Sequence, residues 1–599
     1  MKNNKKSGKI IGMFSKENIY GGGVFMVKLL AYLKNYRKEC IFAPLFKLLE
    51  VVFELMVPLV MAKLIDIGIG NQDKNYVLKM FVILIVFAVV GLISSVTAQY
   101  FAAKAAVGFA KELKHSLFCH IQSLSFTEID QLGTSSLITR MTSDMNQVQS
   151  GVNMTLRLVL RSPFVVFGAM ILAFTIDVKA ALIFVVTIPL LTIVIFGIML
   201  WCIPRYKTVQ EKLDKVLETT RENLTGIRVI RAFCKEKEEI GRFHERTEEL
   251  TDIQKKVGRI SALMNPVTYC MINIAIGVLI WQGAIRVNVG LLTQGAVVAL
   301  YNYMSQILIE LIKLANLILN MTKSVACGNR IQSIFEICSS MEEGVYKEES
   351  PKENLPFVEF DHVSLRYKGA GDEALKDIHF SVKKGETVGI IGGTGSGKSS
   401  LVHLLPRFYD ATEGEVRING VDVRKYSLKE LRQKVTVVLQ KAVLFQGTIR
   451  ENMQWGNKNA TDEEIYNALT IAQAKDVVDG KRGKLDYVIE QGGKNLSGGQ
   501  RQRLTIARAL LCHGEILILD DSTSALDYQT DANLRKAIRN MENSPIVFIV
   551  SQRTSSIQHA DKIIVLEDGK MAGVGTHEEL LESCEVYQEI YYSQFKKEA

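Results

Sequence analysis

Residues 387–399 read TVGIIGGTGSGKS, and this stretch decides the fold of the C-terminal half. Thr387–Ile391 is a short β-branched run typical of a buried strand, and a glycine-rich turn follows at once. The turn ends in Lys398 and Ser399, which completes the phosphate-loop pattern GxxxxGK[ST]. Backbone N–H groups of such a loop close around phosphates, the lysine neutralises their charge, and the serine hydroxyl ligates Mg²⁺. The expected nucleotide ligands are Gly392, Gly393, Thr394, Gly395, Ser396, Gly397, Lys398, Ser399 and Ser400.

Two further motifs lie downstream of this loop. Ile516–Leu519 (ILIL) is a buried-strand run that ends in Asp520 and Asp521, where a second acidic residue of a phosphate-loop protein holds Mg²⁺. We assign that role to Asp520. Between the two motifs, Leu496–Gln500 (LSGGQ) precedes a basic amphipathic segment, and a Ser-Gly-Gly turn at a helix start offers N–H groups and a hydroxyl to an anion. Taken alone, that turn is weak evidence.

The N-terminal half is apolar in a pattern that predicts membrane spans. About 20 uncharged residues suffice to cross a bilayer core of about 30 Å. Two weaker spans, 40–67 and 152–176, contain charges; Arg157 and Arg161 place the lower end of the second in polar surroundings or in the protein interior. We predict six spans in all, of which four are uncharged throughout: 81–103, 180–203, 261–285 and 287–309.

Charge in the connecting segments orients these spans. The long loop 204–260 holds 14 Lys+Arg, whereas the links at 177–179 and around Arg286 are short. The positive-inside bias places the long loops, the basic N-terminal arm and the C-terminal half in the cytoplasm. The arm lacks a signal-peptide core. Residues 27–37 alternate basic and apolar residues, which favours an interfacial helix, with a plain cytoplasmic helix as the alternative.

Composition excludes several classes of protein. The 599 residues carry 72 Lys+Arg against 63 Asp+Glu, a formal net charge of +9, and 48% are hydrophobic. This apolar content, without a glycine period, excludes disordered and collagen-like chains. The nine cysteines lie far apart with no CxxC pair, so they favour reduced or membrane-buried thiols and support neither a disulfide framework nor a zinc site.

Together, the phosphate loop, LSGGQ, the ILILDD strand and the SALD segment Ser524–Asp527 resemble an ATP-binding cassette (ABC) exporter half-transporter. The resemblance covers nearly the whole chain. It implies six transmembrane helices with long cytoplasmic extensions, followed by an α/β phosphate-loop ATPase cassette with a helical subdomain, acting as a transport ATPase with ATP and Mg²⁺. The expected parts are an arm with an interfacial helix (1–37), a transmembrane domain with two coupling loops (38–330), a linker (331–354) and the cassette (355–599).

The resemblance also implies roles for single residues. Tyr367, in SLRYKG, stands where the family stacks an aromatic ring on adenine, and Gln440 where it places the glutamine that senses Mg²⁺. Glu490 matches the acidic contact to the transmembrane loops. In the partner's site the signature turn, Ser497, Gly498, Gly499 and Gln500, would contact ATP.

The cytoplasmic loops match the family as well. Glu222–Phe233 (ENLTGIRVIRAF), with Gly226 and Arg228, resembles the second coupling helix, which reaches into the partner's cassette. Phe126–Thr139 resembles the first. Periodicity alone indicates only amphipathic loop helices.

Two positions depart from the family, and both concern hydrolysis. The family's glutamate that polarises the attacking water is replaced by Asp521, which reaches about 1.5 Å less. The switch histidine is replaced by Gln552, which can hydrogen-bond a phosphate but cannot carry a proton or a positive charge. The expected outcome is a site that binds ATP well and hydrolyses it poorly, because misplacement of about 1 Å can cost about 100-fold in rate.

This asymmetry predicts a partner. Family cassettes pair head to tail, so the intact LSGGQ of this chain would complete a second site whose glutamate and histidine come from another half-transporter. We therefore expect a heterodimer in a cell membrane, resembling bacterial inner-membrane multidrug exporters, with no nucleic-acid partner. The alternatives are a homodimer with two slow sites, an ATP-binding regulatory subunit and an ATP-gated channel.

Charges inside the predicted spans bear on the cargo. Lys47, Glu50 and Glu54 share one helix face of the first span, and Glu310 and Lys313 are three residues apart on the sixth. One interpretation is an acidic cavity lining that attracts cationic amphiphiles, such as drugs or lipid-like compounds. The other is internal ion pairing, Lys47 with Glu50 and Glu310 with Lys313.

Overall fold

The structure is a computed structural model that describes residues 28–346, 356–541 and 544–595. It divides into two units, each described separately below. The helical unit comprises Met1–Gln122 and Thr134–Ile337, and the cassette unit comprises Ser123–Gly133 and Cys338–Ala599. Most of the expected basic arm lies outside the described residues.

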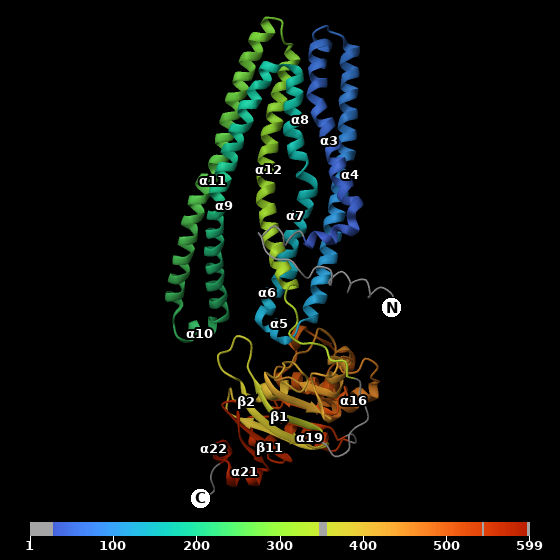
Figure 1. Ribbon diagram of the computed structural model, residues 1–599, viewed down its shortest axis with the longest axis vertical. Helices are drawn as coiled ribbons and strands as arrows, with labels where there is room; N and C mark the ends of the chain where they lie inside the picture. The colour runs from blue at the N-terminus through green and yellow to red at the C-terminus, as the bar shows by residue number, and fades with distance from the viewer. Residues whose placement is uncertain (1–27, 347–355, 542–543, 596–599) are drawn as a thin grey trace. The chain divides into compact units, whose positions relative to one another are not determined.

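The helical unit is built from long helices (Figure 1). A short 3₁₀ turn, η1 (Leu30–Tyr36), precedes the first of them, within the segment predicted as an interfacial helix. The elements that follow are α3 (Arg37–Lys63), η2 (Leu64–Ile69), α4 (Lys74–Ser123), α6 (Thr134–Thr139), η3 (Arg140–Asp144), α7 (Met145–Leu158), α8 (Arg161–Ile176), α9 (Val178–Thr225), α10 (Ile227–Ala232), α11 (Glu236–Asn288) and α12 (Gln294–Phe335).

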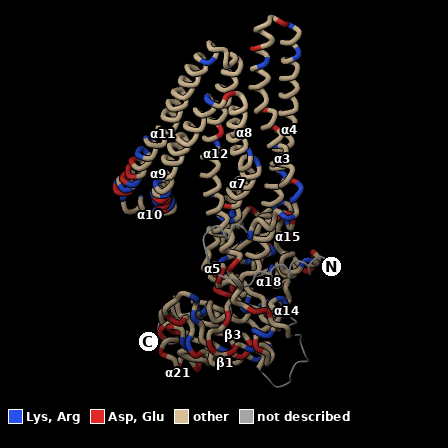
Figure 2. Tube along the Cα trace, turned by 45° about the horizontal axis from the view of Figure 1, so that its top comes forward, with Lys and Arg blue, Asp and Glu red and all other residues tan. Residues whose placement is uncertain are grey.

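Five of these helical segments in the described part of the chain are long and apolar enough to cross a membrane by length and composition: 74–123, 134–176, 178–225, 236–288 and 294–335. Helix α3, the first predicted span, is 27 residues long but carries interior charges. Figure 2 shows Lys, Arg, Asp and Glu gathered at the α10 ends of α9 and α11, while the opposite halves of these helices are almost free of charge. Six spans therefore stay the prediction, with α3 as the charged one.

One predicted boundary is wrong. The sequence placed a link at Arg286 and the start of the sixth span at Val287, whereas α11 continues to Asn288 and α12 begins at Gln294. Thr293 caps α12 by accepting a hydrogen bond from the Ala296 N–H at 3.3 Å. Arg286 stays helical and its guanidinium lies 2.5 Å from Asp177, so a charge that seemed to mark a loop is neutralised by the other short link.

Small and branched apolar side chains form the core of the helical unit. Helices α9 and α11 pack along each other, and α12 packs against α3, α7 and α8. Fully buried Tyr303 of α12 donates a hydrogen bond to the Leu55 carbonyl of α3 at 2.6 Å. That contact fixes the two helices against each other.

The cassette unit contains two main sheets. An antiparallel sheet has the order β2-β1-β4-β5, and a six-stranded sheet has the order β12-β11-β3-β10-β9-β6, in which only the β11–β12 pair is antiparallel. Its central strands, β3, β10 and β9, consist mainly of buried aliphatic residues, as expected for a parallel sheet covered on both faces. The strands are β1 (Val358–Leu365), β2 (Leu375–Val382), β3 (Thr387–Gly392), β4 (Glu413–Ile418), β5 (Val421–Asp422), β6 (Val435–Val438), β7 (Gly447–Thr448), β8 (Val488–Ile489), β9 (Ile516–Asp520), β10 (Ile546–Val550), β11 (Lys562–Glu567) and β12 (Lys570–Gly575).

Helices complete the cassette unit, and one of them comes from the N-terminal half of the chain. This helix, α5 (Phe126–Leu132), starts with a capping box in which Ser125 and Glu128 satisfy each other's backbone N–H groups. The others are α13 (Lys398–His403), α14 (Leu428–Lys434), α15 (Ile449–Met453), α16 (Asp462–Ile471), α17 (Lys475–Asp479), α18 (Gly498–Leu510), α19 (Tyr528–Arg539), α20 (Thr554–Ile557), α21 (His577–Ser583) and α22 (Glu585–Gln594).

Candidate nucleotide-binding site and its neighbours

The predicted phosphate loop joins β3 to α13 at the carboxyl end of the parallel sheet. Its glycines are required by space and by backbone conformation. A Cβ at Gly392 would lie 2.1 Å from the Leu566 carbonyl oxygen, and Gly397 has a φ of +94°. A Cβ at Gly393 or Gly395 would meet nothing within 4 Å among the described residues, so this side of the loop is open to an incoming group.

The lysine of the motif points into the loop. The Lys398 ammonium donates to the Gly392 and Gly393 carbonyls at 3.0 and 2.6 Å and lies 3.4 Å from the Ser396 hydroxyl. Burial lowers the pKa of Lys398, and Asp521 and Asp520 oppose this shift. The Lys398 ammonium is held by two backbone carbonyls, and Gly393 and Gly395 leave the space beside it open. This arrangement fits the binding of phosphate groups, to which the lysine can turn.

The two expected Mg²⁺ ligands meet. The Ser399 hydroxyl donates to Asp520 Oδ1 at 2.8 Å, and Asp520, at the end of β9, is only 2% exposed. His403 Nε2 lies 3.3 Å from Asp520 Oδ2. Sequence reasoning missed this histidine, although its position four residues after Ser399 puts both side chains on one face of α13. Hydroxyl and carboxylate oxygens are ligands that Mg²⁺ prefers, so these residues fit the ion.

Asp521 lies beside the same site in a left-handed backbone conformation, with a φ of +43°. Its carboxylate accepts a hydrogen bond from the Gln440 amide at 3.2 Å. Burial raises the pKa of the Asp521 carboxyl, and the Gln440 hydrogen bond only partly offsets this. The structure thus brings together Asp521, the predicted degenerate base, and Gln440, the predicted Mg²⁺-sensing glutamine.

The switch position has a different environment. The Gln552 side chain is exposed after the end of β10, and its backbone carbonyl accepts a hydrogen bond from the Gln594 amide at 2.7 Å. Gln594, from the C-terminal helix α22, also accepts from the N–H and the hydroxyl of buried Thr554, both at 3.0 Å. Helix α22 therefore holds the backbone that directly follows the predicted switch position.

The predicted adenine platform lies next to α5. Tyr367 donates a hydrogen bond to Ser400 at 2.9 Å, and its ring meets that of Tyr409 edge-on at 5.0 Å between centroids. Tyr409 in turn donates to Asp130 of α5 at 2.6 Å, and Phe126 packs on Phe408 at 4.7 Å. No local sequence pattern signals this contact, because Tyr409 and Asp130 are 279 positions apart.

The signature turn forms the N-terminus of α18. Ser497 accepts a hydrogen bond from the Gln500 N–H at 3.3 Å, and Gln500 accepts one from the Ser497 N–H at 3.0 Å. Ser497 and Gly498 are exposed, and Gly499 and Gln500 are half-buried. A capping box on an exposed helix start presents N–H groups outward, as the predicted contact to a partner's ATP requires.

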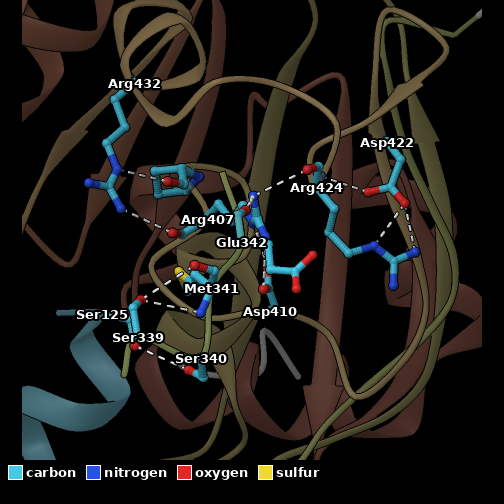
Figure 3. Close-up of polar contacts among 11 residues, drawn as sticks. Ser125, Ser339, Ser340, Met341, Glu342, Arg407, Asp410, Asp422, Arg424 and Arg432 are labelled. Carbon is cyan, nitrogen blue, oxygen red and sulfur yellow. Dashed lines mark hydrogen bonds and ion pairs between the residues drawn. The ribbon is translucent and has the colours of Figure 1, made fainter. Parts of the chain in front are cut away.

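Figure 3 shows how the segment after α12 is attached to the cassette. The Arg407 guanidinium, 3% exposed, donates to the Glu342 and Arg424 carbonyls at 2.9 and 3.2 Å and pairs with Asp410 at 2.6 Å. In the same segment Ser340 lies 3.3 Å from Ser125, which starts α5. Residues 403–410 therefore contact the Mg²⁺ site, the linker and α5 in turn.

The remaining predicted site residues divide into two groups. Exposed Glu490 directly follows β8, and half-buried Gly226 and exposed Arg228 lie at the start of α10. The intramembrane carboxylates are paired inside the helical unit: Glu50 contacts Lys47 at 2.6 Å, and Glu310 contacts Lys313 at 2.8 Å. Both pairs are those expected if the intramembrane charges pair with each other rather than line an acidic cavity.

Arg161 joins the Glu310–Lys313 pair to Glu54 of α3. It lies 2.6 Å from Glu54 and 3.1 Å from Glu310, and Ser162 donates to Glu310 at 3.0 Å. Arg161 is 7% exposed, in the protein interior as the sequence had allowed. Sequence reasoning did not identify it as the partner of both glutamates, since it lies on another helix.

Comparison with known proteins places this geometry in a family. Residues 40–311 match the family described as ABC transporter transmembrane region, and residues 375–524 match the family described as ABC transporter. The chain is 36% identical over 578 residues to "Uncharacterized ABC transporter ATP-binding protein YfiB" of Bacillus subtilis, which covers 96% of this chain and 99% of that protein. It is 33% identical over 489 residues to an ATP-dependent lipid A-core flippase of Desulfotalea psychrophila, which covers 81% of this chain and 84% of that protein.

A solved structure shares the fold. "Structure of a bacterial Atm1-family ABC exporter with ATP bound" matches with a TM-score of 0.79 at 22% identity, over 94% of this chain and 100% of that chain. This chain belongs to the ABC transporter family. It is an exporter half-transporter, a multi-pass membrane protein with a helical membrane domain followed by an α/β ATPase cassette that couples ATP hydrolysis to transport. The predicted fold class is confirmed.

Proposed function

We propose that this chain is one subunit of a heterodimeric exporter, in which its own phosphate loop retains ATP and its signature turn completes the partner's hydrolytic site. The observation that carries the proposal is the residue at the end of β9. Asp521 accepts a hydrogen bond from Gln440, and its side chain is one methylene shorter than the family's glutamate. Ser399 contacts Asp520, and Lys398 lies in the phosphate loop, as their predicted roles require.

The residues of this chain then act in sequence. Tyr367 and the loop glycines would position the nucleotide, Lys398 would neutralise its phosphates, and Ser399 with Asp520 would hold Mg²⁺. Bound Mg·ATP supplies the phosphoanhydride bond whose cleavage resets the transport cycle. Asp521 would reach about 1.5 Å less far toward an attacking water than the family's glutamate, and this shorter reach, rather than its raised pKa, would limit it as a base. Exposed Gln552 supplies no positive charge.

The test compares ATP hydrolysis by this chain alone and together with the half-transporter encoded next to it, both reconstituted in lipid. We expect strong activity only in the mixed sample. Changing the partner's glutamate to glutamine abolishes it, while Asp521→Asn in this chain changes it less than about twofold. The Asn side chain matches Asp in size and so serves as the control.

Comparable hydrolysis by the chain alone, lost on Asp521→Asn, would contradict the heterodimer and make the homodimer the leading model. Transport that survives as ATP-gated flux down a gradient would favour the channel alternative.

For the cargo, we propose amphiphilic or lipid-like compounds. The support is the similarity to a protein named as a lipid A-core flippase, and the apolar spans whose interior charges are internally paired. Stimulation of ATP hydrolysis by candidate lipids and amphiphilic drugs, measured in the mixed sample, tests this choice. Stimulation by polar peptides alone would exclude it.

A further inference from the structure

The β1–β2 pair of the antiparallel sheet carries a cluster of metal-ligating side chains, on a different sheet from the phosphate loop. His362 of β1 and Asp377 and His379 of β2 place one ligand atom each within 4.8 Å of one another. Both histidines and the aspartate are exposed. None of them has a role in the nucleotide chemistry described above.

The strand geometry explains why these three side chains converge. Asp377 and His379 alternate with buried Ile378 and Phe380, so both point to the solvent face of β2. The opposite strand shifts register between Phe360 and Val363, and such a bulge turns an extra residue outward.

His362 is that extra residue. His362 and Asp377 both have a φ of +48°, a conformation that His and Asp tolerate better than most residues. Their side chains meet across the strands, with His362 Nδ1 2.6 Å from Asp377 Oδ1, and the rings of His362 and His379 stack at 5.4 Å.

From this geometry we infer that His362, Asp377 and His379 form a surface site for a borderline divalent cation, of which Zn²⁺ is the best fit. Two imidazoles and one carboxylate suit zinc, which takes three protein ligands and a water molecule. Bonds of about 2.0–2.2 Å in a tetrahedron require ligand atoms about 3.3 Å apart.

The present spacing can reach that value by small movements. The distance between His362 Nδ1 and Asp377 Oδ1 has to increase from 2.6 Å. The ligand atom of His379, which lies within 4.8 Å of the other two, has to move closer to them. Both side chains of the ion pair are about 70% exposed, at 69% and 71%, so rotation meets little resistance. The neighbouring residue Asp361, which forms an ion pair with Arg417, adds negative potential near the cluster. Bound metal would cross-link the two strands without contacting the Mg·ATP residues.

The test uses the full-length protein with its affinity tag removed, in detergent and without nucleotide. Titration with Co²⁺ should give the visible absorption of a low-coordinate site, displaced by one equivalent of Zn²⁺ per chain. His362→Asn and His379→Gln should each weaken Zn²⁺ binding at least about tenfold, and His379→Cys, which restores a ligand, should recover it. His244→Gln, at an exposed histidine outside the cluster, is the matched control.

A thermal readout separates loss of the site from loss of the fold. Zn²⁺ should raise the unfolding temperature of the wild type and of His244→Gln, but not that of His379→Gln, while all three should unfold at the same temperature in a chelator. Zn²⁺ binding that is unchanged in His362→Asn and His379→Gln, or equally lost in His244→Gln, would overturn the inference. So would an absorption spectrum of six-coordinate Co²⁺ only.

Discussion

In the proposed heterodimer, Asp521 and Gln552 are the residues that would slow turnover at the phosphate-loop site of this chain. The first contacts Gln440 and the second lies exposed after β10, and neither disturbs the Ser399–Asp520 contact. The residues that hold ATP and those that cleave it are thus separable in one site. Such a separation is expected if retention of ATP has a use of its own.

The double change Asp521→Glu and Gln552→His restores the missing methylene and the imidazole. We expect ATP hydrolysis at this site to rise by about 10- to 100-fold, because a misplacement of about 1 Å has a cost of that order. The measurement uses the complex in which the partner's catalytic glutamate is changed to glutamine, so that only this site contributes. Unchanged hydrolysis would show that these two residues are not the limiting feature.

Helices of the membrane domain are joined by charge as well as by apolar packing. Arg161 at the start of α8 contacts Glu54 of α3 and Glu310 of α12, and Glu310 is 3% exposed. A charge removed from such a network leaves its partner buried and unpaired, which costs more than the pair itself contributes.

Arg161→Gln should therefore destabilise the membrane domain by about 3–5 kcal/mol. Lys313→Gln removes a contact to the same glutamate, but the lysine side chain is 43% exposed, so we expect at most about 1 kcal/mol. Thermal unfolding of both variants in one detergent compares the two. Equal losses would contradict a central role for Arg161.

Local motifs made much of this architecture predictable. The phosphate loop and the acidic pair of ILILDD each directly follow a strand. Parallel strands bring their carboxyl ends to one edge of the sheet, so the contact between Ser399 and Asp520 follows from sequence. The Arg161 network and the Tyr409–Asp130 contact did not follow, since no sequence motif marks their members as the phosphate loop and the ILILDD strand mark Ser399 and Asp520. The predicted start of α12 was wrong because a charged residue between two apolar stretches indicates a loop. Arg286 instead stays in α11, where it pairs with Asp177.

At the scale of the whole chain, α5 belongs to the cassette unit, while the chain segments on both sides of it belong to the helical unit. Tyr409 touches the predicted adenine platform with its ring and α5 with its hydroxyl. A single side chain therefore contacts both the nucleotide residues and a segment that is continuous with the membrane helices.

Tyr409→Phe keeps the ring and removes the hydroxyl. We expect ATP affinity to change less than about twofold, while stimulation of hydrolysis by cargo falls about tenfold, since a hydrogen bond to a charged acceptor contributes about 1.5–3 kcal/mol. Asp130→Ala should have the same effect and Asp130→Asn, which keeps an acceptor, a smaller one. If Tyr409→Phe and Asp130→Ala were additive in the double variant, they would not report one shared contact.

The placement of α5 also sets an order of events during synthesis. Ser123–Gly133 emerges about 200 residues ahead of Cys338, where the rest of its unit begins, which at ribosomal speed is about 10 to 40 s. Throughout that interval Phe126 has no cassette surface on which to dock, and nascent α5 is a short helix with an exposed aromatic ring. The cassette of this protein therefore includes a segment that is made well before the rest of it, and a cassette expressed from Cys338 onward would lack the Phe126 ring that packs on Phe408.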